Sequence, residues 1–264
     1  MSDPVIDADY NVRNTVPPAE FDRIIAEHRS ASSAATMGMI GHTGITYDAA
    51  SGQKLDVWGT EEGLRPAFVV VHGGYWRMLS RHDASFMART LDASGIATVA
   101  IDYGLAPATP LKEIVRQVRS AVAWVYHHGA QHGLAPERIV VGGSSAGGHL
   151  VGVTMVTGWQ QELGLPAVVI RGALPISGLF DLRPLVRSIA NEWLRLDTED
   201  AAALSAMLLG GQVGLPAIVA VAEHDGAGFV DQSVQFHEQW VTHSPSAGHA
   251  QPVGAACGAG SQSL

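Results

Sequence analysis

The sequence predicts an α/β fold, with an open, mostly parallel, doubly wound sheet and helices on both of its faces. Two observations lead to this prediction. Continuous apolar runs rich in β-branched residues, such as the run at 67–71, are typical of strands buried on both faces of a sheet. These runs alternate with segments of helical periodicity, and an alternation of this length indicates a parallel sheet. No internal repeat and no change in composition interrupts it before residue 242.

The chain is expected to open with an arm and a hairpin. Residues 1–17 contain two adjacent prolines and little apolar periodicity, so we predict an arm that leads into a helix near Glu20 to His28. Ile45 to Asp48 and Lys54 to Trp58 flank a turn at Ser51-Gly52. This pattern predicts an antiparallel hairpin at the start of the sheet.

Strands and helices then alternate. The clearest helix spans 111–128, where apolar residues recur at spacings of three and four and form one stripe. The predicted elements are strand 67–73, helix 83–94, strand 96–102, helix 111–128, strand 138–143, a helix from about Ala146, strand 168–177, strand 217–223 and helix 229–241. We therefore expect one domain over residues 18–241.

The tail differs from the rest of the chain. Residues 242–264 are rich in Gly, Ala, Ser and Pro and contain neither an apolar run long enough for a strand nor a helical stripe. A doubly wound sheet would normally continue with another strand after helix 229–241. We therefore expect the C-terminal strand and helix of the fold to be missing or altered; a flexible C-terminal extension is the alternative interpretation.

Composition excludes several classes of function. The 264 residues carry a net charge of −9 with no cluster of Lys or Arg, which disfavours nucleic acids and anionic membranes as partners. Cys257 is the only cysteine, which excludes an intramolecular disulfide and a Cys-based zinc site. The sequence shows no signal peptide and no run of the roughly 20 apolar residues that span a bilayer. We expect a cytoplasmic protein without metal or cofactor, acting on a small molecule, with a homodimer as one candidate assembly.

The motif with the most chemical content is Gly143-Ser144-Ser145-Ala146-Gly147, between strand 138–143 and the following helix. It matches the G-x-S-x-G pattern of a nucleophile elbow, where glycines let a tight turn close while the serine hydroxyl projects from the sheet. Ser145 is thus the candidate nucleophile. The alternative is a glycine-rich helix start that holds phosphate on its amide groups, although the lysine of a P-loop is absent.

A second motif, His72-Gly73-Gly74-Tyr75-Trp76, follows the first buried strand. Its glycines allow backbone amide groups to turn toward an oxyanion. The amides of Gly73, Gly74 or Tyr75, together with that of Ala146, would stabilise a tetrahedral intermediate. We expect His72 to brace this loop. Tyr75 and Trp76 either pack in the core or form an aromatic wall for the substrate.

Four segments together resemble the α/β-hydrolase superfamily, and more closely its kynurenine formamidase (arylformamidase) branch. They are HGGYW (72–76), GGSSAGGHL (142–150), PISGLFDLRPL (175–185) and EHDGAGFVDQS (223–233). The resemblance covers residues 40–241. It implies an α/β-hydrolase fold and a catalytic triad in the chain order Ser, acid, His.

The resemblance places the triad acid at Asp225, with Glu223 as the alternative; either could also be an ordinary solvated carboxylate. The histidines that follow are His237, expected on a helix surface, His243 and His249. His249 lies nearest to where the base should fall, 24 residues beyond Asp225 (249 − 225). The family's histidine is usually followed by an aromatic residue, and that context is missing here. The other interpretation is therefore that the native histidine segment has been lost.

The resemblance implies a serine hydrolase that cleaves N-formyl-L-kynurenine to kynurenine and formate through an acyl-serine intermediate. Two alternatives remain open. One is a short-acyl carboxylesterase, because relatives with these motifs hydrolyse many esters. The other is a hydrolase-like binding protein that lacks its base.

Overall fold

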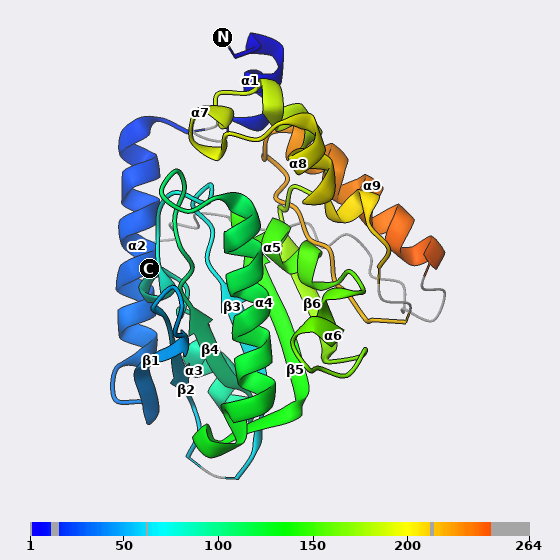
Figure 1. The fold of residues 1–264 in the computed structure, drawn as a ribbon. Coiled ribbons are helices and arrows are strands. Elements are labelled where there is room, and N and C mark those ends of the chain that lie inside the picture. The colour runs from blue at the N-terminus through cyan, green and yellow to red at the C-terminus, as the bar shows by residue number, and fades with distance from the viewer. Residues whose placement is uncertain (1, 12–15, 62, 212–213, 244–264) are drawn as a thin grey trace.

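A computed structural model describes residues 2–11, 16–61, 63–211 and 214–243. Within them a six-stranded sheet has the order β1-β2-β4-β3-β5-β6 (Figure 1). The pairs β1–β2 and β2–β4 are antiparallel, whereas β4, β3, β5 and β6 run parallel. The strands are β1 (Gly41–Asp48), β2 (Gln53–Trp58), β3 (Arg65–Val71), β4 (Ala97–Ile101), β5 (Leu134–Ser144) and β6 (Ile170–Ile176).

Helices flank the sheet on both faces and cover its carboxyl edge. In Figure 1, α1, α7 and α8 lie together at one end of the molecule. The helices are α1 (Pro4–Tyr10), α2 (Pro18–Thr36), α3 (Ala88–Ala93), α4 (Leu111–His128), α5 (Ala146–Thr154), α6 (Trp159–Glu162), α7 (Asn191–Leu194), α8 (Thr198–Ala203) and α9 (Ala227–His243). Short 3-10 turns are η2 (Arg81–Asp83), η3 (Gly129–His132), η4 (Arg183–Arg187) and η5 (Ala206–Leu208).

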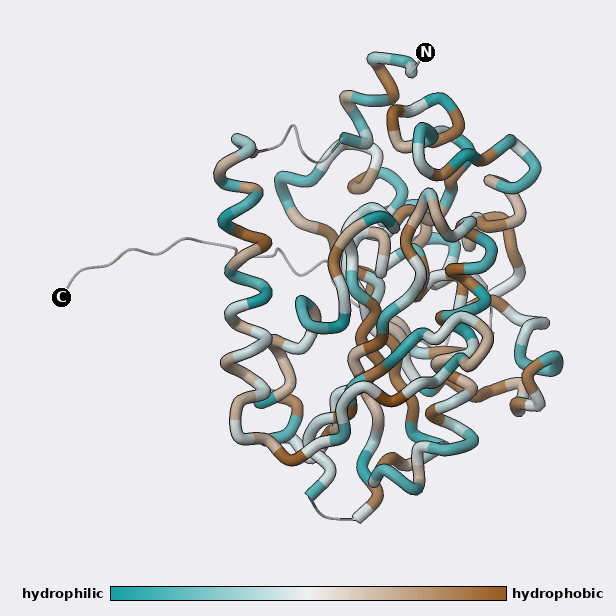
Figure 2. The backbone as a smooth tube through the Cα atoms, turned by 60° about the vertical axis from the view of Figure 1, so that its left-hand side comes forward, coloured by the Kyte–Doolittle hydropathy of each residue, from teal (hydrophilic) through white to brown (hydrophobic). Residues whose placement is uncertain are grey.

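Strand β3 shows why the central apolar runs are continuous. Val69 and Val71 point into the main core, where α4 and α5 pack. Phe68 and Val70 point to the opposite face, where they form a smaller cluster with Ala84. Because successive side chains of a strand alternate between faces, a strand covered on both sides must be apolar at every position. Figure 2 shows the hydrophobic stretches concentrated along these central strands.

Several predicted elements are confirmed. The hairpin at the start of the sheet forms, as the antiparallel pair β1–β2, and the helix predicted over 111–128 has those bounds. The prediction of one helix over 83–94 is wrong, because η2 ends at Asp83 and the shorter α3 begins only at Ala88.

The strand predicted over 217–223 is also wrong as a continuous element. Only isolated parallel bridges form with β6, at Ala173↔Ala217 and Ile176↔Ala220. Pro175 of β6 and Pro216 have no amide hydrogen to donate, which removes ladder bonds along this pairing. The segment still runs beside β6 and leads its following loop to the carboxyl edge of the sheet.

The arm predicted over residues 1–17 contains α1, a helix that the sequence pattern did not indicate. Pro4 stands in its first turn, and the Asp3 carboxylate accepts a hydrogen bond of 3.0 Å from the Val5 amide. Tyr10 packs against Phe229 of α9, with ring centroids 6.2 Å apart. The described part of the arm that forms α1 is thus packed into the fold at the carboxyl edge. The tail predicted from residue 242 lies outside the described residues, apart from the last two residues of α9.

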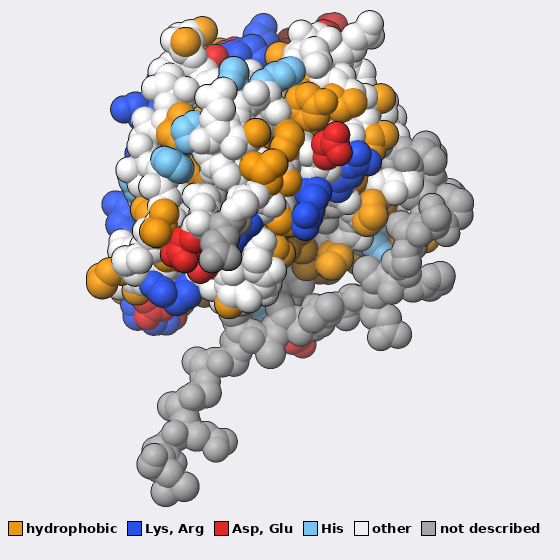
Figure 3. All heavy atoms as spheres, turned by 90° about the horizontal axis from the view of Figure 1, so that it is seen from below, with side chains coloured by type: hydrophobic (Ala, Val, Ile, Leu, Met, Phe, Trp, Pro, Cys, Tyr) orange, Lys and Arg blue, Asp and Glu red, His pale blue; other side chains and the backbone are white. Residues whose placement is uncertain are grey.

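Charged side chains of both signs are interspersed on the face seen in Figure 3. Among the residues described there, no extended region carries one sign alone. None of the helices in the described ranges combines the length and the apolar character that crossing a bilayer requires.

His149 ties α5 to two other parts of the fold. Its Nδ1 accepts a hydrogen bond of 3.2 Å from the Trp76 indole, and its Nε2 lies 2.9 Å from the Leu204 carbonyl oxygen. An indole nitrogen can only donate, so the neutral ring must carry its proton on Nε2. Burial is the main cause that lowers the pKa of His149, to about 4.

We expect the protein to lose stability as the pH falls from about 6.5 to about 4. An unfolded histidine takes up its proton near pH 6.5, whereas His149 and His72 in the folded state do so only near pH 4. The unfolded state therefore binds more protons in this window, and the free energy of unfolding decreases by up to about 3 kcal/mol for each histidine. Urea unfolding at pH values across this window should show that the free energy of unfolding depends less steeply on pH in His149→Gln than in the unmodified protein. An identical slope in both proteins would contradict the assignment.

Candidate active site

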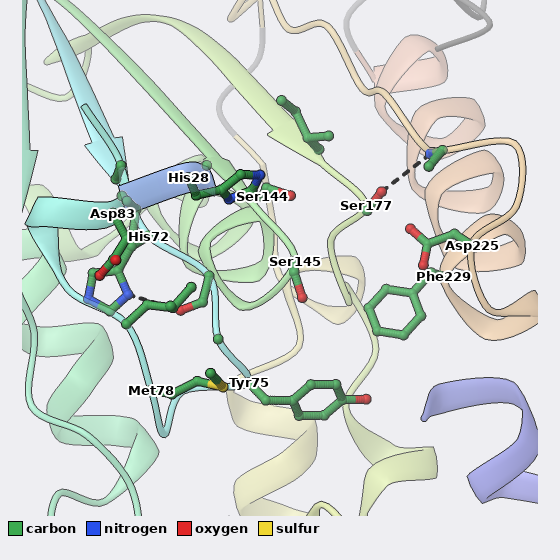
Figure 4. A pocket seen from close by; sticks show the side chains of 18 of the residues that line it. His28, His72, Tyr75, Met78, Asp83, Ser144, Ser145, Ser177, Asp225 and Phe229 are labelled. Carbon is green, nitrogen blue, oxygen red and sulfur yellow. Dashed lines mark hydrogen bonds between the residues drawn. The ribbon is translucent and has the colours of Figure 1, made fainter. Parts of the chain in front are cut away.

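Ser145 stands on a strained turn between β5 and α5. Its φ of 58° and ψ of −120° lie in a region that non-glycine residues rarely adopt. The Ser145 amide donates a hydrogen bond of 2.8 Å to the Ile176 carbonyl, which fixes the turn to the end of β6. Figure 4 shows the Ser145 side chain pointing toward the side of the cavity where Tyr75 and Phe229 lie.

Close backbone packing explains the glycines around Ser145. A Cβ atom added to Gly143 would lie 2.6 Å from the Val71 carbonyl oxygen. One added to Gly147 would lie 2.8 Å from the His72 carbonyl oxygen, and still closer to that of Val71. Both clashes are with backbone atoms of β3 and its loop, which cannot rotate away as a side chain can. The glycines of the G-x-S-x-G pattern are therefore required because β3, β5 and α5 approach each other closely.

The loop that follows β3 is held by Tyr103. The Tyr103 hydroxyl lies 2.9 Å from the His72 carbonyl oxygen and 3.1 Å from that of Gly73. His72 Nδ1 lies 2.9 Å from the same Gly73 oxygen. In a planar trans peptide the N–H points opposite to the C=O, so the Gly73 and Gly74 amides are turned away from Tyr103.

These amide groups lie beside the serine. A Cβ added to Gly73 would lie 3.6 Å from Cβ of Ser145, so the two residues are direct neighbours. The Ala146 amide is the first of α5, where helical amide groups have no partner within the helix. The arrangement thus offers donors near Ser145 to a group that gains negative charge.

We expect Tyr103→Phe to lower kcat roughly five- to tenfold with little change in KM, because the loop loses one bond that orients its amides. The measurement is steady-state hydrolysis of a short-chain aryl ester. Tyr47→Phe is a matched control, since the Tyr47 hydroxyl donates to the Asp102 carbonyl, away from the cavity lining. Equal kcat for Tyr103→Phe and the unmodified protein would exclude the positioning role.

His72 fits the expected bracing role. Its ring is buried and stacks on Tyr103, with centroids 4.0 Å apart and planes 11° from parallel. Burial lowers its pKa to about 4, so the ring is neutral at physiological pH.

Tyr75 and Trp76 occupy different environments. Tyr75 lines the cavity, and its hydroxyl donates to the Tyr10 carbonyl of α1. Trp76, for which core packing and an aromatic substrate wall were the two alternatives, is fully buried beneath the loop and does not line the cavity. Its indole nitrogen donates a hydrogen bond to His149 Nδ1. Trp193 of α7 instead contacts Tyr75 edge to face at 5.8 Å, a neighbour that no sequence motif indicated.

Asp225 lines the same cavity as Ser145. It precedes α9, and its carboxylate accepts a hydrogen bond of 3.0 Å from the Gly226 amide. Figure 4 shows its side chain beside Phe229 and on the same side of the cavity as Ser177. Glu223, the alternative acid, is exposed and outside the lining.

Among the described residues, no histidine predicted as the catalytic base lines the cavity with Ser145. His249 lies outside the described residues. His237 belongs to α9 and does not line the cavity. The described histidines that do line it are His72, already held by the loop, and His28 of α2.

The cavity has a volume of about 660 Å³ and opens at the carboxyl edge of the parallel strands. Most of its wall is apolar, with contributions from β3, α2, the loop 72–79, α1, α7 and α9. In the ranges that the structure describes, no three His, Cys, Asp or Glu side chains are arranged to hold a metal ion.

Comparison with known proteins adds three findings. A family model described as the alpha/beta hydrolase fold matches residues 68–212. Kynurenine formamidase of Salmo salar is 34% identical over 202 residues, which span 74% of this chain and 66% of that protein. The Danio rerio enzyme of the same name is 30% identical over 250 residues, 90% of this chain and 83% of that protein.

Ester hydrolases are also similar. Carboxylesterase NlhH of Mycobacterium tuberculosis is 30% identical over 182 residues, 61% of this chain and 56% of that protein. A crystal structure from Silicibacter sp. TM1040, provisionally named a thioesterase, is 29% identical with a TM-score of 0.74. The match covers 89% of this chain and 86% of that one.

Proposed function

The chain belongs to the α/β-hydrolase family, and we propose that it is a serine hydrolase that cleaves the small acyl amide N-formyl-L-kynurenine to kynurenine and formate. The observation that carries the proposal is the position of Ser145. It stands on a strained elbow, in contact with Gly73 and in one apolar cavity with Asp225. The similarity to two kynurenine formamidases supports the choice of a formyl amide.

The reaction proceeds in two steps. Ser145 Oγ attacks the formyl carbon while a histidine takes its proton. The amides of Gly73, Gly74 and Ala146 bind the oxyanion, and Asp225 orients the histidine and stabilises its cation. The C–N bond then breaks, the histidine gives the proton to the aryl amine, and kynurenine leaves. Water, activated by the same histidine, attacks the formyl-serine and releases formate. The candidate base is His249.

An apolar, aromatic cavity suits an aryl leaving group. Tyr75, Phe229 and Trp193 supply ring surface on one side of it, and the rest of the wall is mostly apolar. A formyl group itself needs little space, so the size of the cavity is used mainly by the leaving group.

A short-acyl carboxylesterase is the second candidate, favoured by the similarity to carboxylesterase NlhH. The two functions are separated by measuring formate release from N-formyl-L-kynurenine and acid release from a short-chain aryl ester with the same protein. We expect the higher kcat/KM for the formamide. A higher value for the ester would support the carboxylesterase, and no turnover of either would favour a binding protein without a base.

A further inference from the structure

The charged side chains that line the cavity fall into two groups. Two of the carboxylates, those of Asp83 and Asp225, already have an ion-pair partner or a proposed catalytic role. Asp83 receives hydrogen bonds of 2.7 and 2.9 Å from the Arg29 guanidinium, and Asp225 is the proposed triad acid. Arg77 and Asp7 remain, one cationic and one anionic, and the proposed chemistry uses neither.

Arg77 is placed to bind an anion. It follows the loop glycines, is exposed, and holds its guanidinium 4.3 Å from the centre of the Trp193 ring. In the part of the chain that the structure describes, no carboxylate pairs with it. Stacking on an indole leaves the edge of the guanidinium, with its N–H donors, open to a carboxylate.

Asp7 supplies the opposite charge. It lies on α1, and its Oδ1 accepts a hydrogen bond of 2.6 Å from the amide of Ile189, which also lines the cavity. This bond fixes the carboxylate close to α7, the helix that carries Trp193. Among the described residues no Lys or Arg forms an ion pair with Asp7, so its second oxygen is available to a cation.

A row of aromatic rings leads from Arg77 to the reacting groups. Trp193 contacts Tyr75 at 5.8 Å, and Tyr75 contacts Phe229 at 6.4 Å. Phe229 lies beside Asp225 (Figure 4). A ligand whose aryl ring lies along this row could place its reacting bond at Ser145 and its far end at Arg77 and Asp7.

We infer that Arg77 and Asp7 form a recognition site for a zwitterionic α-amino acid group on the leaving group of the substrate. The guanidinium binds the carboxylate, and Asp7 binds the ammonium. The inference rests on the proposed function and extends it, because it explains how a hydrolase with an apolar cavity selects an aryl amide that carries a free amino acid.

The kinetic test uses Arg77→Gln and Arg77→Lys with two substrates. For N-formyl-L-kynurenine we expect Arg77→Gln to raise KM roughly tenfold with kcat nearly unchanged, and Arg77→Lys to restore part of the loss. A neutral short-chain aryl ester should show no change. Arg138→Gln, at an exposed arginine in the first half of β5, makes the same change in net charge and serves as control. Equal increases in KM for both substrates would overturn the inference.

A binding test does not depend on turnover. L-kynurenine and its decarboxylated analogue kynuramine are titrated into Ser145→Ala by calorimetry. We expect kynurenine to bind roughly tenfold more tightly, and Arg77→Gln to abolish the difference. Asp7→Asn keeps an oxygen for the Ile189 amide and should weaken both ligands equally. Equal affinity of the two ligands for Ser145→Ala, or no binding of kynurenine, would refute the site.

The two tests separate this inference from the proposed function. If the protein cleaves the ester but not the formamide, yet prefers kynurenine to kynuramine through Arg77, the formamidase proposal fails and the recognition site stands. If it cleaves the formamide and Arg77→Gln has no effect, the function stands and the recognition site fails.

Discussion

Replacing Ser145 by alanine is expected to lower kcat/KM by about four to six orders of magnitude, the range found when a serine hydrolase loses its nucleophile. The substitution removes only the attacking oxygen and does not change the backbone conformation of the turn. The fold should therefore persist with its β5–α5 connection intact. Residual hydrolysis would come from oxyanion stabilisation and binding alone. The measurement is hydrolysis of the better of the two substrates, with circular dichroism as a check of folding.

Labelling with a fluorophosphonate gives an independent readout of the same prediction. This reagent modifies a serine that an assembled base and oxyanion hole have activated. Intact mass should show one adduct on the unmodified protein and none on Ser145→Ala. A single adduct on both would mean that another serine is the nucleophile. His249→Ala is then the variant that tests the proposed base, because it should lose the adduct while keeping the fold.

Gly147→Ala is expected to destabilise the protein by at least about 3 kcal/mol, the upper range for an overpacked site. The added methyl group would meet two backbone carbonyl oxygens, those of Val71 and His72, at the end of β3. Relief would require α5 to move away from the sheet, and α5 carries much of the main core. Urea unfolding measures the change.

The matched control is Gly210→Ala. A Cβ at Gly210 would have only the Thr157 hydroxyl within contact distance, at 3.8 Å, and Gly210 does not have a positive φ. We expect a change below about 1 kcal/mol there. Similar stabilities of the two variants would show that the close approach of α5 and β3 is not required.

Much of the fold could be predicted because its signals are local. The alternation of apolar runs with segments of helical periodicity can be recognised within short stretches of the sequence. The helix over Leu111–His128, for example, forms where its apolar stripe predicts it. The elements that differ from the prediction depend on contacts with residues far away in the sequence. Residues 217–223 have strand composition, but the prolines at 175 and 216 limit the bridges that β6 can form with them. Helix α1 is short, and its Tyr10 packs on α9, more than 200 residues later in the chain.

The sequence by itself determined the turn at Ser145 and the glycine loop after β3, since both depend on glycines at fixed positions. The position of each aromatic and charged side chain around the cavity was decided only by the tertiary structure. Trp76 and Tyr75 are adjacent in sequence, yet one is buried against His149 and the other lines the cavity. Arg77 of the loop after β3 stacks on Trp193 of α7, and Asp7 of α1 accepts a hydrogen bond from Ile189, so three separate segments contribute to one cavity wall. The reason is physical: local backbone preferences act between neighbours in sequence, whereas a binding surface is formed by packing between distant segments.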